Sequence, residues 1–468
     1  MAVNNLSVTN NDVLKRKDIF LGMICVMFFL DTVGPVASMG ASAITWSLII
    51  TLVFFFPSGL VMAEMGSAYP AEGGMYAWVK MAYGKRWGAR MSWFYWANNA
   101  IWLSSTAIFT TSVFCQIFLG DVPFFYQIIM ALALIWCIIL YGFRPLKKNT
   151  GLTNLGAVLK IVIAGAMAAM AVIFLVKGNS PANEISLDSL KPTFNDTFLF
   201  FPALIYNYLG FEVMSSMGNR IKNPTQDVPK ATISTAFLIS ALYILAVLAI
   251  LIIVPAENMT IVDAIMDCFL FADLSPWASA LVVYCLGIVF LVVLFVQAST
   301  WIVAAGRLAA GAAADHEFPA IYGKRHKTND TPIGALFITG SVATVLTIVY
   351  GLVASNAEDL FWTLFSFTNI IFLMPYVINF QAFIKLRRTV TPLAGAYRVP
   401  GKDYVGNFFG RLEQIILLLT IAIIIIGPLF SEGLLTSLSL LGGTLVVLVI
   451  GELLIRASQK KGEDSCQE

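Results

Sequence analysis

Apolar runs of about 20 residues recur along the whole chain, separated by short polar stretches. Such runs are long enough for an α-helix to cross a hydrocarbon core of roughly 30 Å, and they lack the alternation of barrel strands. The pattern therefore predicts an all-α integral membrane protein with about twelve transmembrane helices. The predicted spans are 18–40, 43–66, 88–118, 123–143, 152–176, 196–219, 230–255, 275–306, 332–354, 358–384, 411–430 and 434–456.

The composition agrees with this pattern. Of 468 residues, 59% are hydrophobic and 12% charged, and the mean hydropathy is +0.82, which is outside the usual range of soluble domains. The loops are short, so we expect one transmembrane domain over 18–456, an N-terminal tail over 1–17 and a C-terminal tail over 457–468. The first apolar run is too long for a cleavable signal peptide, and we expect it to stay.

The charges separate into two sets. Lys15, Arg16 and Lys17 precede the first span, and most other Lys and Arg fall on that same side. The opposite loops are mainly acidic: Asp121, Glu184, Asp188, Asp263, Asp273, Glu358, Asp359 and Glu432. This asymmetry predicts a multi-pass protein of the inner (cytoplasmic) membrane with both termini in the cytoplasm. Topology accounts for the basic loops, and nucleic-acid binding is not indicated.

No metal or cofactor site is indicated. The six cysteines are scattered, and the only histidines, His316 and His326, share one loop, which removes most metal-site and histidine-based catalytic interpretations. The spans also lack the paired catalytic residues of membrane-embedded enzymes. We therefore expect no cofactor and no enzymatic activity.

Two segments echo each other. GPVASMG (34–40) in the first span and GFEVMSSMG (210–218) in the sixth each contain a helix-breaking glycine and end in Ser-Met-Gly. Because five spans separate them, the two segments enter the membrane from opposite sides, as an inverted repeat of five plus five helices requires. The repeats would cover about 18–176 and 196–384, with two extra helices over 411–456. Interrupted helices at matching positions point to a substrate site at the midplane.

Four ionisable residues stand within apolar spans: Asp31, Glu64, Lys160 and Glu212. Each costs about 2.5 to 3.5 kcal/mol at a helix centre, so each needs an interior partner or a cavity. Glu64 lies near the cytoplasmic end of its span, where a structural contact to the following loop is the favoured interpretation.

Asp31 lies near mid-depth and precedes Thr32, Val33, Gly34 and Pro35. Pro35 suits the first turn of a second half-helix, and Gly34 suits the irregular backbone before it. Asp31 and the freed backbone carbonyls could face a cavity and attract a cation. Equally, Asp31 could cap the second half-helix or pair with Lys160 without meeting a substrate.

The other two charges also have two interpretations each. Lys160 lies roughly 14 Å into the fifth span, where it is either a buried structural cation or a proton-linked one. Glu212 follows the second break, where it either exchanges protons with a gradient or caps the next half-helix. Aromatic residues beside polar breaks, namely Tyr206 near Asn207, Trp301 and Phe361, could gate a substrate or contact its cation. Core packing is the commoner role for any one of them.

Three stretches carry a family resemblance. They are AEMGSAYPAEGGMYAWVKMAYGKRWG (63–88), YLGFEVMSSMGNRIKNPTQDVPKA (208–231) and ASTWIVAAGRLAAGAAADHEFPAIYGKRHKTNDTP (298–332). Together they resemble the amino acid, polyamine and organocation (APC) superfamily of permeases over about 18–456. The resemblance implies the leucine-transporter type of inverted repeat, with discontinuous first and sixth helices around the substrate.

The resemblance also suggests roles for single residues. Glu212 matches a Gly-[Phe/Tyr]-Glu carboxylate linked in relatives to proton sensing or amine binding. Tyr206 falls where arginine/agmatine antiporters place a gating tryptophan. Lys160 matches a lysine that replaces a sodium ion in some relatives, and it would lie near Ser299 and Thr300. Sodium coupling is therefore not expected.

The first span departs from the family pattern. Many relatives have a G-[ST]-G turn there, which binds the substrate carboxylate, whereas this chain has DTVGP. The glutamate/GABA-antiporter-like and amine or amino acid permease branches are the most similar. The expected substrate-binding residues are Asp31, Thr32, Val33, Gly34, Tyr206, Asn207, Gly210, Glu212, Trp301 and Phe361. The expected ion-coupling residues are Lys160, Glu212, Ser299 and Thr300.

These features together predict a secondary active transporter that moves an amino acid or an amine such as a polyamine by alternating access. Coupling would be to protons or by exchange of a precursor for its product. The alternatives are a uniporter or exchanger of neutral or aromatic amino acids, and a substrate sensor of the same fold. The expected partners are a small-molecule substrate, protons and the lipid bilayer. The oligomeric state stays open.

Overall fold

The described part of the chain is helical. A computed structural model describes residues 14–71, 73–194, 200–215, 221–258, 264–431 and 433–465. In these ranges the only β-type pairing is an isolated bridge between Leu14 and Ile221. Eleven helical segments among them are long and apolar enough to cross a membrane, and the chain is therefore a multi-pass membrane protein.

Eleven of the twelve predicted spans correspond to these segments. They are Arg16–Ala37, Ser42–Ala68, Lys85–Phe118, Phe124–Gly142, Asn149–Val176, Pro224–Ile253, Pro276–Ala314, Ile333–Gly351, Thr363–Thr389, Asp403–Phe430 and Thr436–Lys460. The predicted sixth span, 196–219, lies partly outside the described residues. Within it the structure describes two short helices, α9 (Phe201–Tyr206) and α10 (Glu212–Ser215).

The first spanning segment consists of three elements. Helix α1 (Arg16–Met27) is followed by Phe28 with φ −83° and ψ 86°, the 3₁₀ turn η1 (Leu30–Thr32) and helix α2 (Val33–Ala37). Pro35 falls in the first turn of α2, where a missing N–H breaks no helical hydrogen bond. The backbone around Phe28 therefore needs hydrogen-bond partners from other parts of the molecule.

Gly210 lies between α9 and α10 and faces the end of α1. Its φ of +126° is accessible to glycine and strained for other residues. A Cβ atom on this residue would lie 2.8 Å from Cγ of Met27. The lack of a side chain thus permits both the local turn and the close approach of the two segments.

The remaining elements surround the first segment. The helices are α3 (Ser42–Ile50), α4 (Phe56–Ala68), α5 (Met75–Tyr83), α6 (Lys85–Phe118), α7 (Phe124–Gly142), α8 (Leu146–Val176), α11 (Pro224–Ile253), α12 (Ala264–Leu270), α13 (Pro276–Ala314), α14 (Ile333–Gly351), α15 (Ala357–Thr389), α16 (Asp403–Ile426), α17 (Pro428–Ser431) and α18 (Leu434–Ser465). A π-helical turn, η2 (Thr51–Phe55), joins α3 to α4, and η5 (Ala256–Asn258) and η6 (Ala320–Gly323) are 3₁₀ turns.

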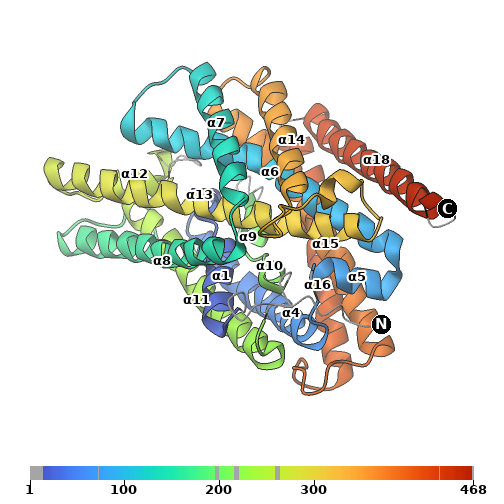
Figure 1. Cartoon of the computed structure of the whole chain (residues 1–468). Helices are drawn as coiled ribbons and strands as arrows, with labels where there is room; N and C mark the ends of the chain where they lie inside the picture. The colour runs from blue at the N-terminus through green and yellow to red at the C-terminus, as the bar shows by residue number, and fades with distance from the viewer. Residues whose placement is uncertain are drawn as a thin grey trace.

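Helix α1 lies at the centre of the bundle. It packs against α8, α11 and α13, and α6 packs against α13, α14 and α15 (Figure 1). The apolar part of the first segment is 94% buried, whereas that of the segments in α16 and α18 is 22% buried. The latter helices therefore lie at the periphery, and Figure 1 shows α18 along one edge.

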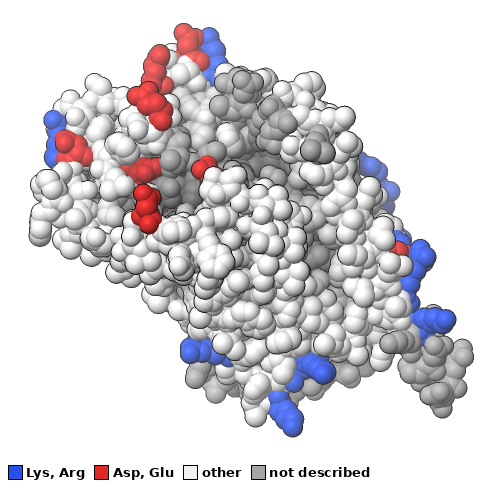
Figure 2. All heavy atoms as spheres, turned by 90° about the horizontal axis from the view of Figure 1, so that it is seen from above, with Lys and Arg blue, Asp and Glu red and all other residues white. Residues whose placement is uncertain are grey.

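Charge is unevenly distributed over the surface. In Figure 2 acidic side chains gather at one end of the visible face and most Lys and Arg at the other, with a broad uncharged band between them. The band agrees with a lipid-facing belt, since charged side chains are costly in hydrocarbon.

Gly334, in the first turn of α14, provides a test of helix packing. A Cβ atom there would overlap the carbonyl oxygen of Ile321 and lie 2.9 Å from Cβ of Lys324. Because backbone must move, Gly334→Ala should lower the free energy of unfolding by about 1–3 kcal/mol, seen as a lower apparent melting temperature of the purified protein. Gly165→Ala in α8 is the control, since no atom lies within 4 Å of its Cβ position. Equal melting temperatures would contradict this packing.

Candidate functional site

The Lys160 ammonium group lies against the end of α1. It is fully buried and donates hydrogen bonds to the carbonyl oxygen of Cys25 at 2.5 Å, to that of Phe28 and to the side-chain oxygen of Gln297. The last carbonyls of a helix have no partner within it and carry partial negative charge, which favours a cation there. Lys160 thus stabilises the point where α1 ends.

Asp31, on η1, is separated from Lys160 by Gln297. The Gln297 amide nitrogen lies 3.4 Å from Oδ1 of Asp31, while its oxygen accepts from Lys160. Oδ2 of Asp31 has no hydrogen-bond partner in the described structure, although the residue is only 1% exposed. The sequence left open whether Asp31 pairs with Lys160; the structure places an amide between them.

Glu212, the first residue of α10, has two tyrosine partners. Its Oε1 atom accepts hydrogen bonds from Tyr95 of α6 at 2.9 Å and from Tyr376 of α15 at 2.7 Å. Its Oε2 atom has no partner among the described residues, and the residue is 2% exposed. Three elements far apart in sequence therefore meet at one carboxylate, and only one of its oxygens has a described partner.

Side chains also join the two interrupted segments directly. The Thr32 hydroxyl is within hydrogen-bond distance of the carbonyl oxygen of Phe29, at 3.1 Å, and of the side-chain oxygen of Asn207. The Asn207 amide nitrogen has no partner in the described residues. The Tyr243 hydroxyl of α11 donates to the carbonyl of Met27 at 2.7 Å and accepts from the Phe29 N–H at 2.6 Å. These contacts satisfy most backbone groups at the end of α1.

Aromatic rings enclose the same region. The Phe29 ring centroid lies 4.9 Å from that of Tyr206, 5.9 Å from Trp301 and 6.2 Å from Trp102. The Trp301 indole N–H donates to the carbonyl of Val26 at 3.0 Å, and that of Trp102 has no partner in the described part of the chain. The Tyr95 ring, whose hydroxyl donates to Glu212, lies 6.2 Å from the Trp301 ring, and Phe29 precedes Asp31 by two residues, so aromatic rings are close to both acidic residues along these contacts.

Other predicted site residues lie farther from these atoms. Phe361 stacks on Phe365 at 5.5 Å, and Phe365 in turn contacts Tyr206 at 5.2 Å, so Phe361 is one layer behind Tyr206. Val33 and Gly34 are buried in α2. The roles of Phe361, Val33 and Gly34 in substrate binding stay predictions.

The structure does not bring the Ser299 and Thr300 hydroxyls to the Lys160 ammonium. Both donate at 2.8 Å to carbonyls of their own helix, those of Phe295 and Val296. Thr300 also lies 2.9 Å from the hydroxyl of Thr153 on α8. Gln297 is the residue of this segment that contacts Lys160, and the ion-coupling role of the two hydroxyls stays a prediction.

Sequence reasoning missed several partners. The only signal in the sequence was that a polar side chain stands inside an apolar span, which is true of Gln297, Tyr95, Tyr376 and Tyr243. Polar residues of this kind are too common to identify these four, because tyrosines in such spans often face lipid interfaces or the core. Glu413 of α16 was also missed; it is fully buried and neither carboxyl oxygen has a described partner.

Glu64 is a structural contact, but not to the loop that follows its span. Its carboxylate pairs with Arg387 of α15 at 2.8 Å and accepts from the Val399 N–H at 2.7 Å. Both side chains of the pair are 5% exposed. The contact fixes the end of α4 to the end of α15 and the segment after it.

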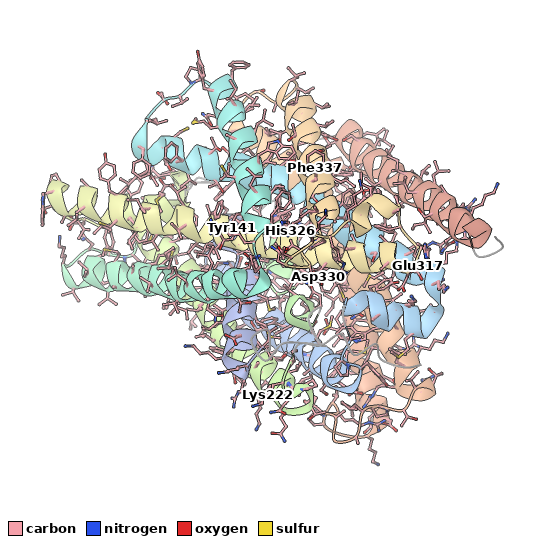
Figure 3. The ribbon with its side chains drawn as sticks, in the orientation of Figure 1. Tyr141, Lys222, Glu317, His326, Asp330 and Phe337 are labelled. Carbon is pink, nitrogen blue, oxygen red and sulfur yellow. The ribbon has the colours of Figure 1, made fainter. Side chains whose placement is uncertain are left out.

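A polar cluster joins α5 to the segment after α13, where Figure 3 labels Glu317. The Tyr76 hydroxyl lies 2.5 Å from Asp315 and 2.9 Å from Glu317, and Lys80 pairs with both carboxylates. Burial raises the pKa of Glu317. Burial acts the same way on Asp315, but hydrogen bonds from Lys80 and Tyr76 outweigh it and lower the pKa of that carboxyl. Glu317 is therefore the more readily protonated of the two.

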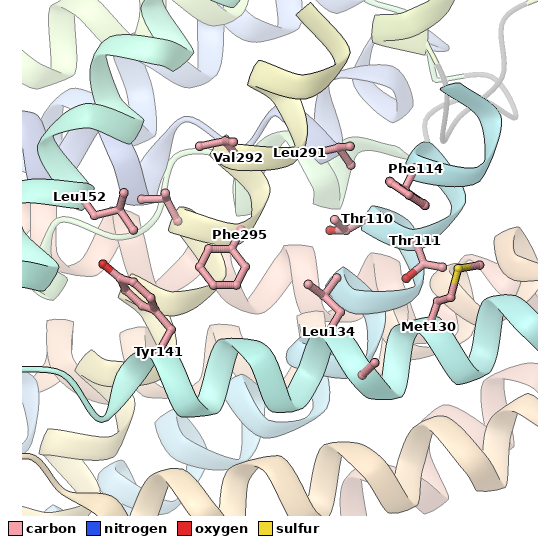
Figure 4. A pocket seen from close by; sticks show the side chains of 12 residues that line it. Thr110, Thr111, Phe114, Met130, Leu134, Tyr141, Leu152, Leu291, Val292 and Phe295 are labelled. Atoms are coloured by element: carbon pink, nitrogen blue, oxygen red, sulfur yellow. The ribbon is translucent and has the colours of Figure 1, made fainter. Parts of the chain in front are cut away.

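A separate cavity of about 600 Å³ lies between α6, α7, α8 and α13 (Figure 4). Its walls are mainly apolar side chains such as Leu134, Leu291 and Phe295. None of the predicted site residues lines it. The residues that the structure describes also contain no cluster of three or more His, Cys, Asp or Glu side chains able to hold a metal. The convergence of polar groups at the interrupted segments is therefore the better candidate site.

Comparison with known sequences assigns the family. The sequence profile of the family described as amino acid permease matches residues 19–450. The chain belongs to this family. The match confirms the resemblance to permeases of the APC superfamily that the three sequence stretches indicated.

Similar proteins are named as transporters. The chain is 30% identical over 441 residues to a probable agmatine/putrescine antiporter of Lactococcus lactis, covering 93% of each sequence. It is 27% identical over 456 residues to an uncharacterized transporter of Legionella pneumophila, covering 94% of this chain and 95% of the relative. It is 28% identical over 256 residues to an inner membrane transporter of Salmonella typhimurium, covering 50% of this chain and 51% of the relative. A transporter role follows for this family member.

Lys160→Met tests the support of the α1 terminus. The variant leaves the acceptors on Cys25, Phe28 and Gln297 without their donor, and we expect a loss of about 2–5 kcal/mol, measured as a lower apparent melting temperature. The control is Lys327→Met, which removes an exposed lysine. A Lys160→Met protein as stable as the control variant would show that the buried ammonium does not support this break.

Proposed function

We propose that this protein is an antiporter that carries cationic amines across the cytoplasmic membrane by alternating access. The observation that carries the proposal is a pair of buried carboxylates, Asp31 and Glu212, each with one oxygen that lacks a partner in the described structure. Asp31 follows Phe29 by two residues, and Tyr95, which donates to Glu212, contacts Trp301 of the aromatic wall that Phe29, Tyr206 and Trp301 form.

The chemistry of this region favours a cation. A buried carboxylate oxygen without a partner is costly, and an ammonium or guanidinium group would offset that cost with charge-assisted hydrogen bonds. The faces of aromatic rings attract the same groups. Two carboxylates on separate segments suit a substrate with a cationic group at each end. Agmatine and putrescine, which appear in the name of the Lactococcus lactis relative, are amines of this kind.

The transport cycle that we propose rests on an inverted repeat. The short helices α1 and α2, and α9 and α10, would be the halves of discontinuous helices one and six. The repeats would cover 18–176 and 196–384, with the extra helices at 411–456. The burial of Asp31 and Glu212 fits a closed state that opens alternately to each side. Separation of charge between the two ends of the molecule supports cytoplasmic termini.

Coupling without sodium is the expected consequence of Lys160. Its ammonium group donates hydrogen bonds to backbone carbonyl oxygens, and carbonyl oxygens of this kind also bind alkali cations. The Lys160 side chain would therefore take the place of a sodium ion. The driving force would then be the gradient of a second amine or of protons. Glu212, with two tyrosine donors on one oxygen and none on the other, is the residue that we propose for either exchange.

A zwitterionic amino acid is the second candidate substrate. The Asn207 amide and the Trp102 indole N–H also lack described partners, and these donors could bind a carboxylate. One of the two acidic residues would then take the amino group. The two candidates differ in net charge, which a substrate panel separates.

Counterflow into proteoliposomes tests the substrate class. We expect agmatine or putrescine inside to drive uptake of the labelled diamine without sodium, and neutral amino acids to compete weakly. Asp31→Asn should lower exchange by about 30-fold or more, because a buried ammonium loses its counter-charge. Asp121→Asn removes an exposed acid as the control. Neutral amino acids as the preferred substrates, or a sodium requirement, would contradict the proposal, and binding without transport would indicate a sensor.

Tyr95→Phe and Tyr376→Phe test the placement of Glu212. Each removes one donor from Oε1, so the carboxylate should be less well held and the affinity for the amine should fall about tenfold. The measurement is the half-saturating amine concentration in counterflow, with Tyr404→Phe, an exposed residue of α16, as the matched control. Unchanged affinity in both variants would exclude Glu212 from the amine site.

A further inference from the structure

A basic pocket of about 210 Å³ lies where α5, α15 and α16 meet, outside the candidate site. Helix α15 packs against both of the others (Figure 1). Lys385 and Arg388 come from the last turns of α15, Arg411 from α16 and Tyr83 from the end of α5. Three cations from two helices therefore converge on one small hollow at the basic end of the molecule.

Two nearby acidic groups, Glu64 and Asp403, are paired with other cations, and Glu413, two residues after Arg411, is fully buried. Glu64 pairs with Arg387, and Asp403 lies within 4 Å of Arg387 and Arg398. By contrast, Lys385, Arg388 and Arg411 have no carboxylate within 4 Å in the described structure. Like charges held in one pocket repel, and an anion bound among them would relieve that repulsion. The pocket therefore suits an anionic ligand.

An apolar surface continues from the pocket along α16. Ile415, Leu418 and Leu419 follow Arg411 by four, seven and eight residues, and so share its face of the helix. Their side chains are 55%, 54% and 60% exposed. The face runs from the basic end of α16 toward the middle of its membrane-spanning stretch. A free phosphate would use only the cations, whereas a phospholipid would use both surfaces.

We propose that this pocket binds an anionic phospholipid of the adjacent leaflet. The phosphodiester lies among Lys385, Arg388 and Arg411, and an acyl chain follows the Ile415 face of α16. Tyr83 closes one side, because the Lys385 ammonium lies 4.4 Å from its ring centroid. Basic pockets between membrane helices at the cytoplasmic surface recognise such headgroups. The lipid would join α15 of the central bundle to peripheral α16.

Lipid-dependent thermal stability of the purified full chain tests the site. Phosphatidylglycerol should raise the apparent melting temperature, and phosphatidylcholine at the same concentration should raise it less. Each cation near an anionic surface contributes about fivefold to the binding affinity. The triple variant Lys385→Gln, Arg388→Gln, Arg411→Gln should therefore bind phosphatidylglycerol on the order of 100-fold more weakly. The control triple variant, Lys230→Gln, Lys324→Gln, Lys327→Gln, removes the same charge from exposed positions and should keep the full response.

Several outcomes would overturn the proposal. An equal response to phosphatidylglycerol in both triple variants would place lipid binding elsewhere. An equal effect of phosphatidylcholine would remove charge recognition, and a full effect of inorganic phosphate would make this a site for free anions. If the triple variant does not fold, Arg411→Gln with native mass spectrometry of retained phosphatidylglycerol gives the same decision. The lipid site stands independently of which substrate is transported.

Discussion

The structure depends on one constraint: where α1 ends in the middle of the bundle, backbone carbonyl and N–H groups have no hydrogen-bond partner within the helix. A membrane offers no water to these carbonyl and N–H groups, so other side chains must satisfy them. Lys160 binds the carbonyls of Cys25 and Phe28, Tyr243 binds Met27 and Phe29, and Trp301 binds Val26. These contacts draw α8, α11 and α13 around α1.

Two kinds of buried polar group can be distinguished in this region. The backbone groups at the end of α1 mostly have hydrogen-bond partners within the protein, whereas some side-chain atoms nearby do not. Asp31, Asn207 and Glu212 each keep one atom without a described partner. Since buried polar groups are normally paired, such atoms mark where a ligand would complete the structure. At the periphery, the cations Lys385, Arg388 and Arg411 likewise have no acidic partner in the described structure, and they lie beside the peripheral helix α16.

Length and hydropathy were sufficient to predict most of the fold. A run of about 20 apolar residues has few alternatives to a membrane helix, and eleven predicted spans correspond to described helices. Pro35 also indicated a second helix in the first segment, but the prediction that Gly34 takes the irregular backbone was wrong: the break lies at Phe28 to Thr32, and Gly34 is already within α2. Glu413 was overlooked because an acidic residue near the end of a span resembles one that water reaches.

The sequence by itself determined that the chain is a helical membrane protein, that its family is that of the permeases, and that Asp31, Lys160 and Glu212 stand within apolar spans. Only the tertiary structure decided their partners. Gln297 separates Asp31 from Lys160, and tyrosines of α6 and α15 meet at Glu212. The physical reason is that the insertion of a helix into lipid depends on the composition of about 20 consecutive residues, which the sequence gives directly. Pairing of buried polar atoms instead depends on how helices far apart in sequence rotate and pack against one another.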